Sequence, residues 1–146
     1  MNKNIDTDQH SAEQLAEKLQ DHGVFPTRQR LIVARAMFER RQHLTADQLL
    51  QRINRDGEAG VSRATVYNTL AAFLRRGLIA VVNTPGGTVY FDSEPNAHIH
   101  LYDEVSGELV DADIDPVALA EKVPLPDGMQ LIGTDVLLRV RRQTGK

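Results

Sequence analysis

Residues 62–79 of this chain read SRATVYNTLAAFLRRGLI and decide its fold. The pattern predicts one short helix with a defined beginning and end. Ser62 is a good N-cap because its hydroxyl can accept a backbone N–H of the first turn. Gly77 suits the left-handed residue that follows a last helical turn. Four apolar residues recur at helical spacing and predict a face buried against other helices: Val66, Leu70, Phe73 and Leu74.

The first turns of the same helix carry polar side chains that can contact phosphates and base edges in a major groove. Two extended runs follow at residues 78–82 and 88–91, and the turn-rich residues 83–87 separate them, which predicts a β-hairpin. A recognition helix followed by a hairpin indicates a winged helix-turn-helix that binds double-stranded DNA. The polar side chains in question are Arg63, Thr65, Tyr67, Asn68 and Thr69.

The chain before this helix fits the same architecture. We expect a helix from Ser11 to His22 and a second helix after the cap residue Thr27. A third helix should begin at Thr45, because Thr45 and Gln48 have the spacing of a capping box. Helices followed by a hairpin match the order of a winged-helix domain.

The second half predicts a different unit. Strands are expected at residues 97–102 and 108–112, a helix capped by Asp115 comes next, and a long strand is expected from 129 to 140. About 50 residues arranged in this way have little core of their own, so we expect homodimerisation through this half.

The expected fold class is therefore α+β, with an N-terminal winged helix-turn-helix domain and a C-terminal α/β dimerisation domain. We expect residues 1–10 to form a disordered tail, 11–92 the DNA-binding domain with its wing, and 93–146 the dimerisation and ligand-sensing domain.

Charge is distributed unevenly along the chain. The net formal charge is −3, but residues 1–85 carry 12 Lys+Arg against 9 Asp+Glu and residues 86–146 carry 5 against 11. The first half is therefore the one suited to phosphate. There is no cysteine, no apolar run long enough to span a membrane and no apolar leader, so we expect a cytoplasmic protein with no membrane partner.

Four motifs, in this order and spacing, resemble the Fur family of metal-responsive transcriptional regulators. The resemblance covers residues 15–140 and implies a homodimer that binds an A/T-rich inverted repeat in promoters. The absence of cysteine and the 66–70 variant VYNTL are most similar to the iron response regulator (Irr) branch. The motifs are Gly23-x-x-x-Thr27-x-Gln29-Arg30, Thr45-Ala46-Asp47-x-Leu49, Ala64-Thr65-Val66-Tyr67 and His98-x-His100.

The resemblance also implies which metal sites to expect. Most members hold a structural zinc with paired cysteines, whereas Asp103 and Ser106 occupy the first such pair here, so no structural Cys₄ zinc is expected. A second regulatory site of the family is also not expected, because Ile99 and Thr134 replace its ligands. The family's hinge site is retained, and its ligands here would be His43, Asp92, His98 and His100.

The chemistry of these residues supports a metal ion. Strand alternation places His98 and His100 on one face, roughly 6–7 Å apart at their Cα atoms. Three imidazoles and a carboxylate suit Fe²⁺, Mn²⁺ or Zn²⁺. We expect one such ion per protomer, and its ligands would come from both domains. The same histidines are also candidates for heme.

For DNA, Tyr67 and Asn68 suit thymine methyls and adenine. Arg28, Arg30 and Arg63 are better suited to phosphates, and Thr65 is a further candidate DNA contact. The alternatives are a partly buried core position for Tyr67 and a solvated helix face for the arginines.

The function expected is a sequence-specific regulator of transcription controlled by metal, with an iron link, or by heme. One alternative is a metal-independent winged-helix module regulated by heme or a partner protein. A small metalloenzyme is the weaker alternative, because no acid–base residue stands in an H-x-E or HExxH pattern.

Overall fold

The structure, a computed structural model, describes residues 11–57 and 60–143. The tail expected at residues 1–10 lies outside them. The chain divides into two compact units, Met1–Pro95 and Asn96–Lys146. No helix in the described ranges is long and apolar enough to cross a membrane.

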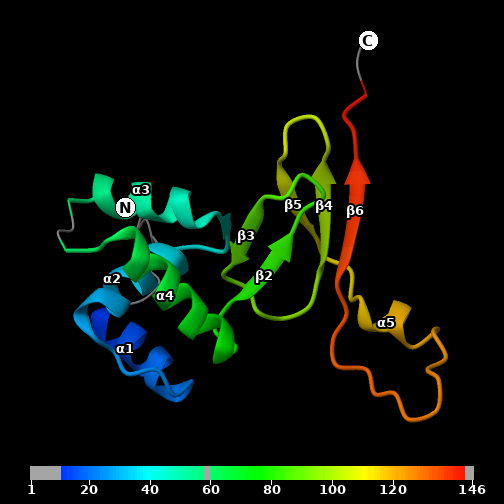
Figure 1. Ribbon diagram of the computed structural model, residues 1–146, viewed down its shortest axis with the longest axis horizontal. Helices are drawn as coiled ribbons and strands as arrows, with labels where there is room; N and C mark the ends of the chain where they lie inside the picture. The colour runs from blue at the N-terminus through cyan, green and yellow to red at the C-terminus, as the bar shows by residue number, and fades with distance from the viewer. Residues whose placement is uncertain (1–10, 58–59, 144–146) are drawn as a thin grey trace, which may run out of the picture. The chain divides into compact units, whose positions relative to one another are not determined.

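Within residues 11–57 and 60–95, the first unit contains four helices and a small sheet (Figure 1). The sheet is antiparallel throughout, in the order β1-β3-β2. Its hairpin, β2 with β3, is the expected wing. In chain order the elements are α1 (Ala12–Asp21), α2 (Arg28–Phe38), β1 (His43–Leu44), α3 (Ala46–Arg55), α4 (Arg63–Arg75), β2 (Ala80–Asn83) and β3 (Val89–Asp92).

Side-chain caps begin the helices where the sequence predicts them. Ser11 and Thr45 both form complete capping boxes, with Gln14 and Gln48 respectively. The Ser62 hydroxyl accepts the N–H of Thr65 at 3.1 Å, and Gly77 ends α4 with φ of +72°. Each cap satisfies an N–H that has no partner within the helix, so these short polar residues fix the helix beginnings.

The core of the first unit lies among its four helices. Val66, Leu70 and Phe73 of α4 are buried as expected, and Leu74 is partly buried beside them. Phe73 packs against Phe38 of α2 with ring centroids 6.1 Å apart. One residue differs from expectation: Thr69 is only 4% exposed. It follows Val66 by three residues and so shares the buried face.

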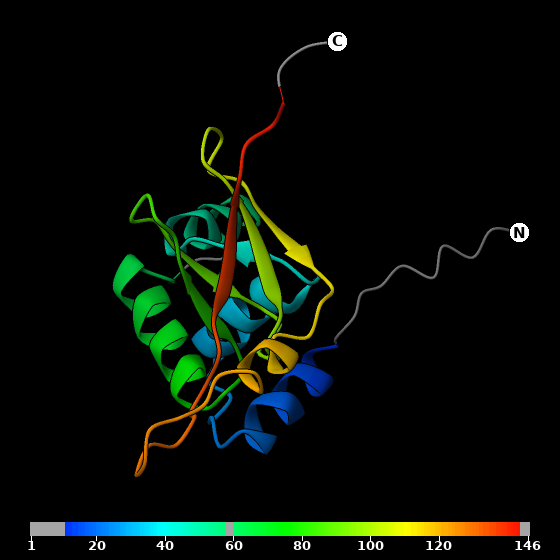
Figure 2. The ribbon, with the colours of Figure 1, turned by 90° about the vertical axis from the view of Figure 1, so that its right-hand side faces the viewer.

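The second unit contains β4 (Ile99–Asp103), β5 (Leu109–Ala112), α5 (Val117–Ala120) and β6 (Val136–Val140). Its sheet has the order β5-β4-β6, with β4 antiparallel to β5 and parallel to β6. The connection from α5 to β6, drawn in orange in Figures 1 and 2, runs away from the sheet before the chain returns.

Two expectations for this unit were wrong, the beginning of the last strand and the cap position of the helix. The strand expected from 129 to 140 begins only at Val136, because β4, its neighbour among the described strands, begins opposite it at Ile99. The helix after Asp115 is a single turn whose cap position is Pro116. The Asp115 carboxylate still accepts the Val117 N–H at 2.9 Å.

The turn between β4 and β5 is closed by the side chain of Asp103. One carboxylate oxygen accepts the N–H groups of Val105 at 2.9 Å and Ser106 at 3.3 Å. The other lies 3.5 Å from Nε of Arg142, beyond the end of β6. The Val105 hydrogen bond, assisted by Ser106 and by the charge of Arg142, lowers the pKa of Asp103 although desolvation opposes it.

This lowered pKa predicts an acid-sensitive contribution to stability. The charged carboxylate stabilises the fold above its unfolded pKa, and this contribution is lost as pH falls through the lower folded value. We expect Asp103→Ala to lower the melting temperature at about pH 6 and the deficit to shrink towards about pH 3. Asp113→Ala, which removes an exposed carboxylate of the same unit, is the control. A deficit independent of pH would contradict the assignment.

Candidate metal centre and DNA-reading helix

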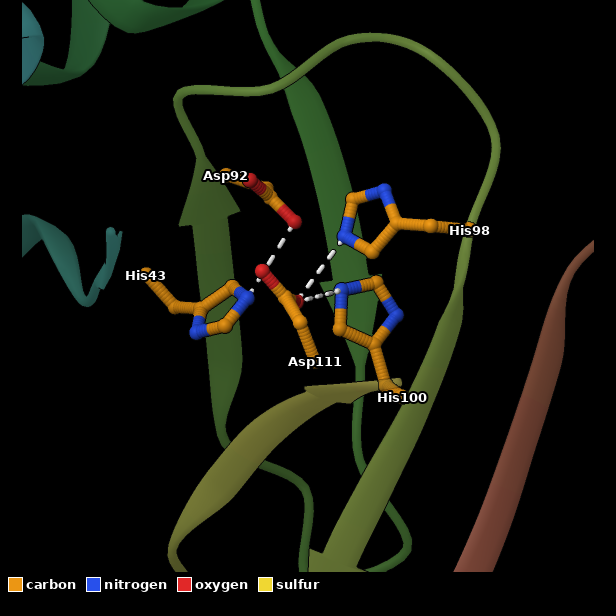
Figure 3. Close-up of side chains that lie close together, drawn as sticks. All are labelled: His43, Asp92, His98, His100 and Asp111. Atoms are coloured by element: carbon orange, nitrogen blue, oxygen red, sulfur yellow. Dashed lines mark ion pairs between the residues drawn. The ribbon is translucent and has the colours of Figure 1, made fainter. Parts of the chain in front are cut away.

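His43 and Asp92 form the first half-site, which belongs entirely to the first unit. The register of β1 and β3 places them directly opposite each other. Nε2 of His43 lies 3.3 Å from Oδ2 of Asp92 (Figure 3). The other oxygen of Asp92 accepts the N–H of Glu94 at 2.9 Å. Asp92 is fully buried, and a buried carboxylate requires such partners to offset the loss of water.

His98, His100 and Asp111 form the second half-site, in the second unit. His100 on β4 is opposite Asp111 on β5. Oδ1 of Asp111 lies 3.0 Å from Nε2 of His98 and 3.4 Å from Nε2 of His100 (Figure 3). The two imidazole rings are 4.3 Å apart at their centroids. Three potential ligand atoms therefore converge.

The hydrogen bond on the far side of His98 defines which nitrogen faces Asp111. Nδ1 lies 2.7 Å from the carbonyl oxygen of Asn96, and because a carbonyl can only accept, Nδ1 must donate. In a neutral ring Nε2 then carries a lone pair directed at a carboxylate, which also has only lone pairs to offer. A proton or a metal cation between the two atoms resolves this repulsion. Metal-binding histidines are commonly oriented by a hydrogen bond of this kind.

Asp111 was not among the residues predicted from the sequence. The signal was present in the hairpin: a turn centred on residues 105–106 pairs Tyr102 with Leu109 and, two residues further, His100 with Asp111. The sequence motif in this segment, His98-x-His100, contains only the two histidines and therefore did not indicate Asp111. Each half-site offers imidazole nitrogen and carboxylate oxygen and no thiolate, and these ligand types suit Fe²⁺, Mn²⁺ or Zn²⁺.

The residues that the sequence resemblance matches to other metal sites form no such site here. The chain has no cysteine, so a Cys₄ zinc site cannot form, and Asp103 with Ser106 forms the turn described above. Ile99 is a buried apolar residue of β4, and Thr134 lies on the connection before β6.

The polar face of α4 lies beside the beginning of α2. Tyr67 is 47% exposed, which argues against the core alternative, and Asn68 is also exposed. A polar depression of about 310 Å³ separates the two helices. It is lined by Thr27, Gln29, Arg30, Thr65, Asn68 and Thr69.

The three arginines differ in their surroundings. Arg28 is exposed at the beginning of α2. Nη1 of Arg30 donates to the carbonyl of Phe25 at 3.0 Å, which holds its side chain along the loop before α2. Arg63 forms an exposed ion pair with Asp47 of α3.

Comparison with known proteins identifies the family. The model of the Ferric uptake regulator family matches residues 21–136, which is most of the chain. The chain belongs to this family. The peroxide-responsive repressor PerR of Staphylococcus aureus is 30% identical over 111 residues, which are 76% of this chain and 74% of that protein.

Solved structures support the same assignment. The ferric uptake regulator of Pseudomonas aeruginosa with manganese is 26% identical, with a TM-score of 0.70 over 88% of this chain and 97% of that one. A zinc-bound manganese uptake regulator is also 26% identical, with a TM-score of 0.65 over 88% and 98%.

Membership confirms three expectations from the sequence. The fold is Fur-like and α+β, with a helical DNA-binding domain followed by a mixed-sheet domain. The function is that of a DNA-binding, metal-responsive regulator of transcription. The relatives that this chain matches are regulators of transcription and not enzymes.

The ion pair of Arg63 generates a prediction about DNA affinity. Asp47 neutralises an arginine that we expect to contact phosphate, so it competes with DNA for the guanidinium. We expect Asp47→Asn to tighten DNA binding by up to about fivefold at low salt, because an exposed pair contributes at most about 1 kcal/mol. Fluorescence anisotropy with labelled operator DNA measures this. In the Arg63→Ala background Asp47→Asn should leave DNA affinity unchanged. An equal gain in affinity there would show that Asp47 does not compete with DNA for Arg63.

Proposed function

We propose that this protein is a homodimeric, iron-linked regulator that binds an A/T-rich inverted repeat, and that one divalent metal ion per protomer, held by both half-sites, controls this binding. The observation that carries the proposal is the second half-site, where two imidazoles and a carboxylate converge, and where Nε2 of His98 and Oδ1 of Asp111 repel each other unless a cation or proton lies between them. His43 and Asp92 would supply the remaining ligands.

Chain connectivity supports sharing of one ion between the half-sites. Only five residues separate Asp92 from His98, so their Cα atoms cannot be more than about 22 Å apart even in a fully extended chain. An ion that takes ligands from both units would favour one arrangement of the units over others, and this preference is what would couple metal to DNA affinity.

Two observations favour iron as the metal: the thiol-free set of ligands and the resemblance to the Irr branch of the family. A thiol-free set of nitrogen and oxygen ligands suits Fe²⁺, although it binds Mn²⁺ and Zn²⁺ as well. Manganese is present in the Pseudomonas aeruginosa structure and zinc in the manganese uptake regulator. The VYNTL variant and the cysteine-free His98-x-His100 motif favour the Irr branch. Heme held by His98 or His100 is the second candidate ligand.

Dimerisation is assigned to the second unit. Several of its large apolar side chains are exposed, and Ile132 is 98% exposed. Apolar surface of this extent on a small unit is typical of a protein interface. We place the dimer in the cytoplasm. The exposed apolar residues include Ile114, Val117, Val123, Leu125, Met129 and Ile132.

DNA contact is assigned to α4 and the beginning of α2. Tyr67 and Asn68 are exposed and would read bases, while Arg28, Arg30 and Arg63 would contact phosphates. Thr65 is a further candidate contact.

Equilibrium metal analysis of the purified dimer tests the proposed centre. We expect one Fe²⁺, Mn²⁺ or Zn²⁺ ion per protomer and its loss in the double variant His98→Ala/His100→Ala. Asp111→Asn should weaken binding because it removes a negative charge beside the ion. His22→Ala is the matched control, since His22 follows α1 and its Nδ1 lies 2.9 Å from the carbonyl oxygen of Lys18. Full metal content in the double variant would reject the site, and heme bound in place of metal would favour the second candidate.

DNA titrations at several salt concentrations test the interface. Affinity for a palindromic A/T-rich site should fall steeply with salt, because phosphate contacts release counterions. Arg63→Ala should weaken binding to all sequences alike, whereas Tyr67→Ala should reduce discrimination between cognate and scrambled sites by about 1–3 kcal/mol. A flat salt response would exclude the proposed interface. If Arg63→Ala and Tyr67→Ala reduce the affinities for cognate and scrambled DNA equally, the assignment of Tyr67 to bases and Arg63 to phosphates is wrong.

A further inference from the structure

Gln42 directly precedes His43 and is a buried polar residue, 9% exposed, to which the function above gives no role. Its side-chain Nε2 donates two hydrogen bonds, to the carbonyls of Ala36 and Met37, each at 2.9 Å. Both carbonyls belong to the last turn of α2, where backbone acceptors lack partners within the helix. The amide of Gln42 therefore anchors the start of β1 to the end of α2.

The backbone of Gln42 is bound on the opposite side by Ser93. The N–H of Gln42 donates to Oγ of Ser93 at 3.0 Å, and the N–H of Ser93 donates to the carbonyl of Gln42 at 3.1 Å. These bonds continue the β1–β3 pairing one step beyond His43 and Asp92. The hydroxyl of Ser93 also donates to the carbonyl of Arg40 at 3.3 Å.

The side-chain oxygen of Gln42 is bound by arginine. Nη1 of Arg52, on α3, donates to Oε1 at 2.6 Å and to Glu39 at 2.8 Å. Nε of Arg40 lies 3.4 Å from the same oxygen. Because its donors and its acceptor are all engaged, the orientation of the Gln42 amide is defined.

We propose that Gln42, with Ser93, is a positioning residue for the first half-site, an inference that rests on the metal function proposed above. β1 has only two residues, His43 and Leu44, and so short a strand has few bonds of its own to hold a ligand in place. A metal ligand must be held within about 0.5 Å of its productive position. The Gln42 bonds to α2, to Arg52 of α3 and to Ser93, which directly follows β3, supply this constraint immediately beside His43 and Asp92.

Gln42→Met tests the inference, because methionine keeps the length of the side chain and loses its amide. Gln29→Met is the matched control: Gln29 also donates one side-chain bond to a backbone carbonyl, that of Gly60 at 2.8 Å, at the opposite end of α2. Zn²⁺ affinity of the full-length dimer is measured by competition with a chromogenic chelator, well below the melting temperature of each variant. We expect Gln42→Met to raise the Kd about tenfold and Ser93→Ala to raise it in the same direction, as for residues that orient ligands.

Thermal stability alone cannot support the inference, so two results decide it. If Gln42→Met melts earlier but binds Zn²⁺ with a Kd within about twofold of the parent and of Gln29→Met, Gln42 is merely structural and the inference is overturned. If the parent binds no Zn²⁺, the proposed function fails, and NMR of the metal-free proteins decides instead. A change in the chemical shifts of the His43 ring caused by Gln42→Met and not by Gln29→Met would then support the proposal that Gln42 positions His43 and Asp92. Unchanged chemical shifts would overturn it.

Discussion

The buried carboxylate of Asp92 is the constraint on which the first unit depends. A negative charge with no access to water requires compensation in place, and the fold supplies it from an imidazole and a backbone N–H. This requirement explains why so short a strand as β1 exists. The chain between α2 and α3 must pair with the end of β3 if His43 is to face Asp92, and that pairing also defines the outer edge of the wing sheet.

Local rules predicted much of the helical architecture. Ser11, Thr45 and Ser62 each begin a helix through a hydrogen bond to a residue three positions ahead, so short sequence patterns contain the whole interaction. The wing was also predictable, since its strands are adjacent and its turn is rich in turn-forming residues. The strand β1 was not predicted because two residues have no periodicity. Its existence depends on a partner almost fifty residues away in the sequence.

The same distinction between local and distant interactions applies to the candidate site. The histidine motif was visible because its members are adjacent, and the family resemblance added His43 and Asp92. Asp111 lies eleven positions after His100 and meets it only through the register of β4 and β5. The extent of β6 was overestimated for a similar reason. Alternating apolar residues predict a strand from residue 129, but β6 begins only at Val136, where β4 is there to pair with it.

The turn at Asp103 gives the second unit a chemical character unlike that of a zinc site built from cysteines. Hydrogen bonds and the charges of Arg141 and Arg142 join the turn to the chain that follows β6. Chelating agents and thiol oxidants dismantle a zinc–cysteine cross-link, but they have no target in this set of ion pairs. High ionic strength does weaken such exposed pairs. This end of the unit therefore offers chelators and thiol oxidants no metal–thiolate bond to break, whereas rising ionic strength weakens the ion pairs that join the turn to the chain after β6.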